Sequence, residues 1–320
     1  MFTFSVITTL CLALISILPL MPSDHWLCRS WEFPRLQIVV LLAINIVFCV
    51  YAGQGMSMWL LVLLSAICMT FQCIWILPYT VLFPKEVSAA SDTSGTSLKI
   101  LTANVLMTNR SEHKLIARVK EHCPDVLVTL ESDERWQDAL SVLHEDYPHR
   151  VAVPKDNLYG MHLYSKFDIV NEKIEYLIEE DIPSISCELL IAPNVPVQCH
   201  FLHPAPPSPT ENEYASPRDK ELMLVAKSVK GNSMPTIVTG DLNDVAWSPT
   251  TRAFKQVSEL QDPRIGRGFF NTFHADYALL RWPLDHIFHS KHFRVADIRR
   301  LKSIDSDHFP LLTQLVINAD

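Results

Sequence analysis

The hydrophobic pattern divides this chain of 320 residues into two unlike parts. Long apolar runs without a charge occupy most of the first 84 residues, whereas short apolar runs between polar and amphipathic stretches follow from Leu98 onward. Residues 85–97, between these parts, are mostly small and polar, a composition typical of a linker. We therefore predict a membrane region over residues 1–84, a linker over residues 85–97 and a soluble domain over residues 98–320.

Three of the apolar runs, at about residues 2–20, 36–52 and 59–82, are long enough to cross a bilayer as helices. A cleaved signal peptide is the alternative for the first run, but this run lacks a basic start and further hydrophobic segments follow it. None of the three contains an ionisable residue, so the pattern indicates an anchor and not a transport path. Arg29 and Arg35 follow the first run, and the positive-inside rule favours a cytoplasmic place for their loop and for the soluble domain.

The soluble part alternates strand-like runs with amphipathic helical stretches, which predicts a mixed α/β sandwich with sheets inside and helices outside. Ser111 is expected to cap a helix that continues to His122. The predicted strands are residues 98–102, 126–128, 150–153, 162–165, 186–191, 197–202, 237–239, 285–288 and 311–316. The predicted helices are residues 111–122, 133–143, 221–229 and 250–260.

Charge and cysteine content narrow the classes of partner. The net charge is −8, and only three of the 27 Lys and Arg residues and four of the 35 acidic residues precede Leu98. The soluble part is therefore acidic, whereas proteins that grip long nucleic acids usually have a basic surface. The eight cysteines show no spacing typical of a zinc site or a disulfide framework, so we expect buried apolar thiols.

Residues 237–248 carry the first candidate chemistry. A β-branched run predicts a buried strand, and Gly240 is expected to end it and let the backbone turn. Asp241 and Asn243 follow two positions apart and would project toward the same side of the strand end. A carboxylate and an amide placed there suit Mg²⁺, or a phosphate held beside it.

Similar polar groups follow other predicted strands. Sites in sheet proteins gather at one rim, so groups at several strand ends are expected to converge. In chain order they are Asn104, Glu131, His203, Asp241 with Asn243, Asp285 with His286, and Ser306 with Asp307 and His308.

This set of motifs resembles the endonuclease/exonuclease/phosphatase superfamily of metal-dependent phosphoesterases, over about residues 98–317. The matching segments are residues 102–105, 130–131, 203–207, 240–244, 285–288 and 306–310. The resemblance is closest to a bacterial branch with about three N-terminal membrane helices and a Trp-Ser pair after the Gly-Asp-x-Asn motif, as at Trp247 and Ser248 here. It implies a four-layer α/β sandwich and hydrolysis of a phosphate ester with Mg²⁺ or Mn²⁺.

The resemblance also implies a metal set. Glu131 would be the main metal ligand and Asn104 would assist it. Asp307 would belong to the same set and form an acid–histidine pair with His308. Hard carboxylate and amide oxygens fit Mg²⁺ and do not favour zinc.

The resemblance further implies roles for five catalytic residues. Asp241 would orient or deprotonate the attacking water, and Asn243 would hold a phosphate oxygen. His308 would lie near the scissile phosphate, with Asp285 buttressing it or the metal, and His203 would contact the phosphate. Such groups can stabilise the charge that builds on the phosphate oxygens during in-line attack.

Other residues near the expected rim have two interpretations. Arg264, Arg267 and Arg281 are candidates to neutralise phosphates, and a solvated basic loop is the equal alternative. Trp247 could stack on a base or sugar, but a packing role is favoured.

The sequence thus predicts a membrane-anchored, Mg²⁺-dependent phosphodiester hydrolase, first of all a nuclease. A phospholipid or small phosphoester phosphodiesterase or phosphatase is the alternative, and a catalytically inactive membrane-tethered binding module is the second. Two partners are expected: a phosphate-ester substrate, which is a nucleic acid or a lipid headgroup, and the membrane, through the N-terminal helices. No protein partner is indicated. The expected location is the bacterial inner membrane, and the related branch favours the periplasmic side for the domain, against the two loop arginines.

Overall fold

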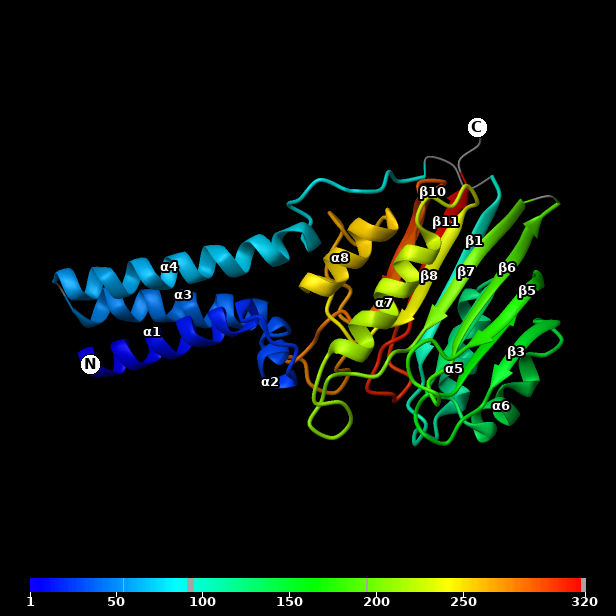
Figure 1. The fold of residues 1–320 in the computed structure, drawn as a ribbon, viewed down its shortest axis with the longest axis horizontal. Coiled ribbons are helices and arrows are strands. Elements are labelled where there is room, and N and C mark those ends of the chain that lie inside the picture. Colours follow the sequence, from blue (N-terminus) through cyan, green and yellow to red (C-terminus); the bar gives the residue numbers. More distant parts are fainter. Residues whose placement is uncertain (54, 91–94, 194, 318–320) are drawn as a thin grey trace.

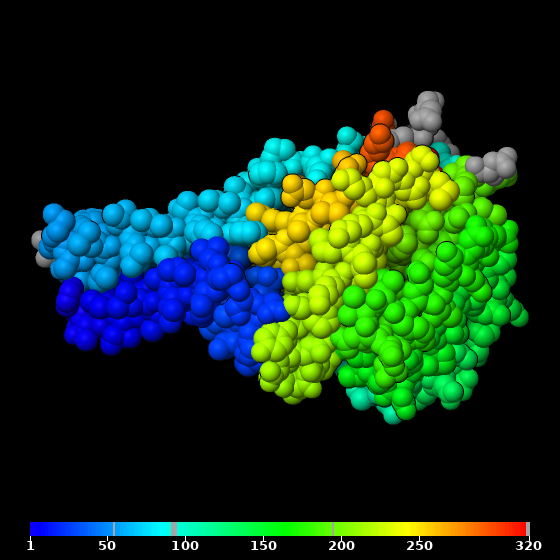
Figure 2. Space-filling model, in the orientation of Figure 1, coloured from blue at the N-terminus to red at the C-terminus, as the bar shows by residue number. Residues whose placement is uncertain are grey.

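Three long helices project as an arm from one side of a rounded two-sheet domain (Figures 1 and 2). The structure is a computed structural model, and it describes residues 1–53, 55–90, 95–193 and 195–317. The N-terminus lies at the far end of the arm, and the chain enters the domain only after the third long helix.

The arm contains α1 (Phe2–Ile17), α3 (Arg35–Ala52) and α4 (Met56–Ile76), with the short α2 (Trp26–Arg29) where the arm meets the domain (Figure 1). Short 3₁₀ turns extend α1 to Leu20 and α4 to Tyr79. Three helices are long and apolar enough to cross a membrane, over Phe2–Leu20, Arg35–Ala52 and Met56–Tyr79. They lie where the apolar runs predict them, although the third ends at Tyr79 and not at residue 82.

Small polar side chains hold the arm together from inside. Asn45 Nδ2 donates to the hydroxyl oxygens of Thr9 at 2.8 Å and Ser65 at 3.0 Å, and its Oδ1 accepts from Thr8 at 2.7 Å. Hydrogen bonds of this kind join helices in an apolar solvent, where the hydrophobic effect between helices is absent. The outer faces of the arm are apolar and exposed, as a surface in contact with lipid would be.

The domain is built on two mixed sheets. The six-stranded sheet has the order β10-β11-β1-β2-β4-β3, and the five-stranded sheet has the order β5-β6-β7-β8-β9. The strands are β1 (Ser97–Asn104), β2 (Val126–Leu130), β3 (His149–Val153), β4 (Met161–Ser165), β5 (Asp168–Glu175), β6 (Ser184–Ala192), β7 (Val195–Leu202), β8 (Thr236–Asp241), β9 (Asp285–His289), β10 (Phe293–Arg300) and β11 (Leu311–Ile317).

The two sheets pack face to face and helices cover their outer faces, so the predicted four-layer sandwich is confirmed. Buried side chains such as Leu189, Val128 and Phe201 fill the space between the sheets. Against the six-stranded sheet lie α5 (Glu112–His122) and α6 (Glu134–Ala139), and a 3₁₀ turn over Leu140–Leu143 completes the second predicted helix. Against the five-stranded sheet lie α7 (Ser216–Val229) and α8 (Pro249–Ser258).

Parallel pairing sets the position of the site. β1 pairs in parallel with β2, and β7 pairs in parallel with β8, so these four strands end at the same side of the domain. The two sheets meet across β1 and β8, where the hydroxyls of Thr102 and Thr239 lie 3.0 Å apart. The carboxyl ends of four central strands therefore form a common rim.

Several local expectations were wrong. Gly240 does not end its strand, because β8 continues to Asp241 and pairs on both sides. Ser111 precedes α5, but its hydroxyl donates to Asp305 Oδ2 at 2.7 Å and makes no capping bond. Strands β5 and β10 were not predicted, and both are edge strands. Between the arm and β1, Val87 is buried and Ala89 bridges to β10.

The segment between α1 and α3 is seated on the domain, as Figure 2 shows at the junction. Backbone hydrogen bonds join Trp26 N to Glu213 O at 2.8 Å and Ala215 N to Asp24 O at 2.7 Å. Arg29 Nη2 donates to the Thr250 hydroxyl at 2.7 Å. The arm and the domain therefore meet through specific polar contacts, and not only through the covalent chain.

Candidate active site

Four of the predicted residues meet at the rim formed by the central strands. Asn104 ends β1, Glu131 follows β2, His203 follows β7 and Asp241 ends β8. Asn104 Nδ2 donates to Glu131 Oε1 at 2.7 Å and to Asp241 Oδ2 at 3.1 Å, and so links the ends of both sheets. In this structure Asn104 orients two carboxylates, while its Oδ1 accepts from Leu106 N at 3.1 Å.

His308 lies between two carboxylates. Its Nδ1 is 2.8 Å from Asp285 Oδ2, and its Nε2 is 3.4 Å from Asp241 Oδ2. Burial would lower the pKa of His308, but Asp241 and Asp285 outweigh burial and raise it to about 10. Burial would likewise raise the pKa of Asp241, but His308 and His203 hold it below its usual value. The group is thus a buried imidazolium between carboxylates.

The backbone of the rim has unusual conformations at Gly240, Glu131 and Asn243, and at Gly240 they let strands β7 and β8 approach closely. Gly240 has φ +151°, and a Cβ there would lie 1.9 Å from the carbonyl oxygen of Leu202. Only glycine fits, so the parallel strands β7 and β8 can bring His203 and Asp241 together. Glu131 and Asn243 have φ +57° and +50°, sparsely populated values that cluster at functional sites in proteins.

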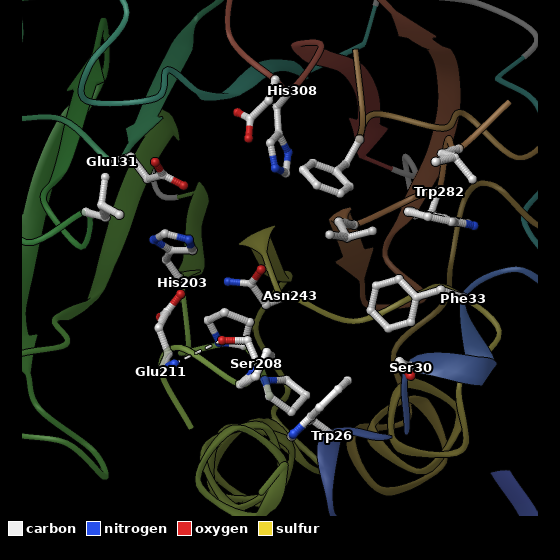
Figure 3. Close-up of a pocket in the computed structure, with 18 of the residues that line it drawn as sticks. Trp26, Ser30, Phe33, Glu131, His203, Ser208, Glu211, Asn243, Trp282 and His308 are labelled. Atoms are coloured by element: carbon white, nitrogen blue, oxygen red, sulfur yellow. Dashed lines mark hydrogen bonds between the residues drawn. The ribbon is translucent and has the colours of Figure 1, made fainter. Parts of the chain in front are cut away.

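Asn243 and His203 face the same cavity (Figure 3). Asn243 N donates to Asp241 Oδ1 at 2.9 Å, and its side-chain Nδ2 donates to Pro204 O at 3.0 Å. Burial lowers the pKa of His203 to about 4, so this imidazole is neutral at pH 7. Its Nε2 is 4.0 Å from Asp241 Oδ2. A neutral imidazole and an amide are thus available as hydrogen-bonding groups for a phosphate oxygen.

The donor set beside Glu131 fits a divalent cation. Burial, the largest cause, raises the pKa of the Glu131 carboxyl to about 7 against the lowering effect of Asn104 and His308, and the nearby carboxylates of Asp307 and Asp241 also raise it. The carboxylates here carry more negative charge than the His308 side chain can balance, and their oxygens are hard ligands of the kind that a divalent cation prefers. Asp241, Asp285 and His308 also lie close enough together for a metal site. His308 is already paired with Asp285 in that group, whereas the Glu131 carboxylate faces the cavity.

The cavity at the rim has a volume of about 590 Å³. Glu131, His203, Asn243, Asp307 and His308 line one end of it, as Figure 3 shows for all but Asp307. The eight predicted site residues therefore lie together, and Asp285 supports His308 from behind. The catalytic or metal-binding role of each of these residues stays a prediction.

The structure gives different roles to the other candidates. Arg264 is not solvated and does not line the cavity, because it is fully buried and donates to both carboxylate oxygens of Asp262 at 2.9 and 2.8 Å. Arg281 donates to the carbonyl oxygen of Ala275 at 2.7 Å. Trp247 is buried, as a packing role requires, and its Nε1 donates to Glu32 O at 2.7 Å.

Sequence reasoning missed the apolar wall of the cavity. The ring of Phe273 lies 4.9 Å from the ring of His308, and Trp26 and Phe33 reach the cavity from the segment before α3. The only sequence signal for the latter is the aromatic content of that segment, which alone indicates a membrane interface.

The comparisons with known proteins agree with this geometry. Residues 101–308 match the Endonuclease/Exonuclease/phosphatase family. The endonuclease/exonuclease/phosphatase from Bacteroides vulgatus superposes with a TM-score of 0.56 at 16% identity, over 69% of this chain and 99% of that chain. The one from Beutenbergia cavernae DSM 12333 gives a TM-score of 0.55 at 17% identity, over 70% and 72%.

A third solved structure is that of D. rerio TDP2 complexed with single strand DNA product, with a TM-score of 0.55 at 14% identity, over 71% of this chain and 100% of that chain. At these identities the likeness shows the fold alone. No curated protein matches the sequence significantly. Because the family match covers most of the chain and ends at the histidine between the two carboxylates, the chain belongs to the endonuclease/exonuclease/phosphatase family.

Proposed function

We propose that this chain is a divalent-metal-dependent phosphodiesterase that its N-terminal helices hold at a membrane. Members of the family are generally hydrolases of phosphoester bonds and usually use a divalent metal. The observation that carries the proposal is the position of the buried His308 side chain between Asp285 and Asp241, with the half-buried Glu131 carboxylate in the same cavity.

The residues of the rim divide the chemistry among them. Glu131 and Asp307 would hold the metal, and the metal would supply positive charge for the phosphate oxygens. Asp241, held ionised by His308, orients the attacking water and accepts its proton. The cationic His308 and the amide of Asn243 stabilise the negative charge that builds on the phosphorane oxygens. Asp285 keeps His308 protonated and in place.

The membrane part of the proposal rests on the three apolar helices. We place the domain on the extracytoplasmic side of a bacterial inner membrane, as the resemblance to the membrane-anchored branch suggests. The two loop arginines, which favour the opposite side, have structural partners within the chain. Arg29 binds Thr250, and Arg35 donates to Gln72 Oε1 at 2.7 Å and lies over the ring of Trp75. A C-terminal alkaline phosphatase fusion, active only outside the cytoplasm, tests the placement.

A nucleic acid is the first substrate class that the sequence predicts, and the D. rerio TDP2 structure contains a single strand DNA product. The lipid headgroup is the alternative. An inactive binding module is the least supported function, since every acid, amide and imidazole of the motif set is present at the rim.

The test is hydrolysis of bis(p-nitrophenyl) phosphate by the full chain in dodecyl maltoside, with Mg²⁺ or Mn²⁺ and with EDTA as the control. Asp241→Asn and His308→Ala should each lower kcat by about a thousandfold, because each removes a group that acts in the transition state. Both variants should keep the circular dichroism spectrum of the folded wild type, which shows that the loss of activity is not a loss of fold. No metal-dependent turnover by the wild type, or full activity in either folded variant, would refute the proposal.

A further inference from the structure

The cavity at the active site is polar at one end and apolar at the other. At the far end from the rim it is lined by aromatic and aliphatic side chains, among them Trp26, Phe33, Leu280 and Trp282. Figure 3 shows His308 and Glu131 on one side of the cavity and Trp26, Phe33 and Trp282 on the other. A ligand that fills the cavity therefore needs an anionic group at one end and an apolar body at the other.

A row of aromatic rings leads from the active site to the arm. The ring centroids of His308 and Phe273 are 4.9 Å apart, and those of Phe273 and Trp282 are 6.3 Å apart. The ring centroid of Phe33 lies 5.7 Å from that of Trp282. Phe33 precedes α3 by two residues. The apolar wall is thus continuous with the end of a helix that is long and apolar enough to cross a membrane.

An exposed apolar loop connects the cavity with the same helix end. Leu279 and Leu280 are 84% and 47% exposed, far more than apolar side chains of a folded interior. Gln37, in the first turn of α3, donates through Nε2 to Leu279 O at 2.8 Å. The loop therefore lies at the level where α3 would enter the bilayer, and its Leu280 also lines the cavity. Exposed leucines at this level are suited to contact with lipid.

The charge of the cavity wall argues against a polynucleotide. None of the residues that line the cavity in the described part of the chain is Lys or Arg, and three are acidic: Glu131, Glu211 and Asp307. Proteins that bind single strands combine aromatic platforms with a positively charged groove for the flanking phosphates. A single phosphate beside a bound metal needs no such groove.

We propose that the substrate is a membrane lipid with a phosphodiester headgroup, an inference that rests on the proposed function. Its phosphate would lie between Glu131 and His308, and its chain would follow the aromatic wall to the bilayer. In the reaction the water oxygen bonds to phosphorus and the bond to the leaving alkoxide oxygen breaks. Asp241 accepts one proton of the water and passes it to the leaving alkoxide, which becomes an alcohol. The other proton stays on the phosphate monoester, so no further reactant is needed.

The cavity volume of about 590 Å³ is within the range of roughly 300–1,000 Å³ typical of ligand sites. It accommodates a headgroup phosphate and the first part of one chain, while the remainder stays in the bilayer. The arm thus has a second task beside anchoring, because it supplies one wall of the substrate site.

The experiment uses alkyl p-nitrophenyl phosphates with chains from methyl to decyl, and a single-stranded 20-nucleotide DNA, with the full chain in dodecyl maltoside. The wild type should hydrolyse the decyl ester with a kcat/KM about tenfold to hundredfold above that of the methyl ester, since each methylene gains by burial. Leu280→Glu should lower this decyl-to-methyl ratio at least about fivefold. Leu224→Glu, at a leucine of α7 with a similar exposure of 45% outside the cavity, should keep the wild-type ratio.

The ratio is measured within each variant, so a change in overall activity does not affect it. A wild-type ratio near one, or DNA cleavage with a higher kcat/KM than that of the decyl ester, would overturn the lipid assignment and leave the phosphodiesterase in place. An unchanged ratio in folded Leu280→Glu would overturn the position of the chain in the cavity. No turnover of any ester would refute the proposed function as well.

Discussion

Two buried polar clusters lie on opposite sides of β9 and differ in how completely their atoms are paired. Asp285 and His286 are consecutive on this strand, so their side chains point in opposite directions. Asp285 faces His308 at the rim, and His286 faces Arg264, whose Nη2 lies 2.8 Å from His286 Nδ1. One strand therefore contributes to both clusters, and the local backbone is the same for each.

In the Arg264 cluster every side-chain polar atom has a partner. Arg264 binds both oxygens of Asp262 and the carbonyl oxygen of Asp285 at 3.2 Å, and His286 Nε2 lies 2.8 Å from Asp244 O. At the rim, by contrast, Asp285 Oδ1 and His203 Nδ1 are buried without a hydrogen-bond partner in the described structure. Buried polar atoms are rarely left unpaired. We infer that the closed cluster stabilises the fold and that the open one is completed by a ligand.

Arg264→Leu should break the closed cluster and have the largest effect on stability. It leaves the Asp262 carboxylate buried and uncompensated, which should lower the free energy of unfolding by about 3–5 kcal/mol. Chemical denaturation of the variant measures this loss. The double variant Arg264→Leu/Asp262→Leu should recover most of it, because no buried charge remains. A single variant as stable as the wild type would contradict a structural role for the cluster.

Asp285→Asn should separate the two clusters, because it changes the charge at the rim and leaves the carbonyl bond to Arg264 intact. His308 loses one of its two carboxylates, so kcat should fall by about a hundredfold to a thousandfold, equivalent to about 3–4 kcal/mol. The KM and the unfolding midpoint should change little. A fall in stability as large as that of Arg264→Leu, with kcat retained, would mean that the rim is also structural.

The same contrast explains which parts of the site could be predicted from sequence. Asn104, Glu131 and Asp241 each follow an apolar run, and parallel pairing of their strands brings such ends together. For Arg264 the sequence favoured either a phosphate contact or a solvated loop, and neither describes a side chain that is fully buried against Asp262. Its one local signal is Asp262, two residues earlier, and a two-residue spacing does not by itself indicate burial.

The rest required tertiary information. Strands β5 and β10 are edge strands, and most residues of β5 are exposed or half-buried, so β5 lacks the burial pattern on which strand prediction depends. The wall formed by Trp26 and Phe33 comes from a segment more than 200 residues before Trp282 in the chain. Nothing in local periodicity connects these two positions, and only the docking of the arm on the domain does.

The smallest predicted effect is the stabilisation of the folded protein by a bound metal, which should depend on the rim and not on the Arg264 cluster. Mg²⁺ at about one hundred times its Kd should stabilise the wild type by about 2.7 kcal/mol, because only the folded rim brings its ligands together. In Glu131→Gln this gain should disappear, while the metal-free variant should be at least as stable as the metal-free wild type, since burial already raises the pKa of that carboxyl to about 7. Arg264→Leu/Asp262→Leu should keep the full gain, because its substitutions lie outside the rim. Thermal denaturation with Mg²⁺ and with EDTA measures all three, and an equal gain in Glu131→Gln would place the metal elsewhere.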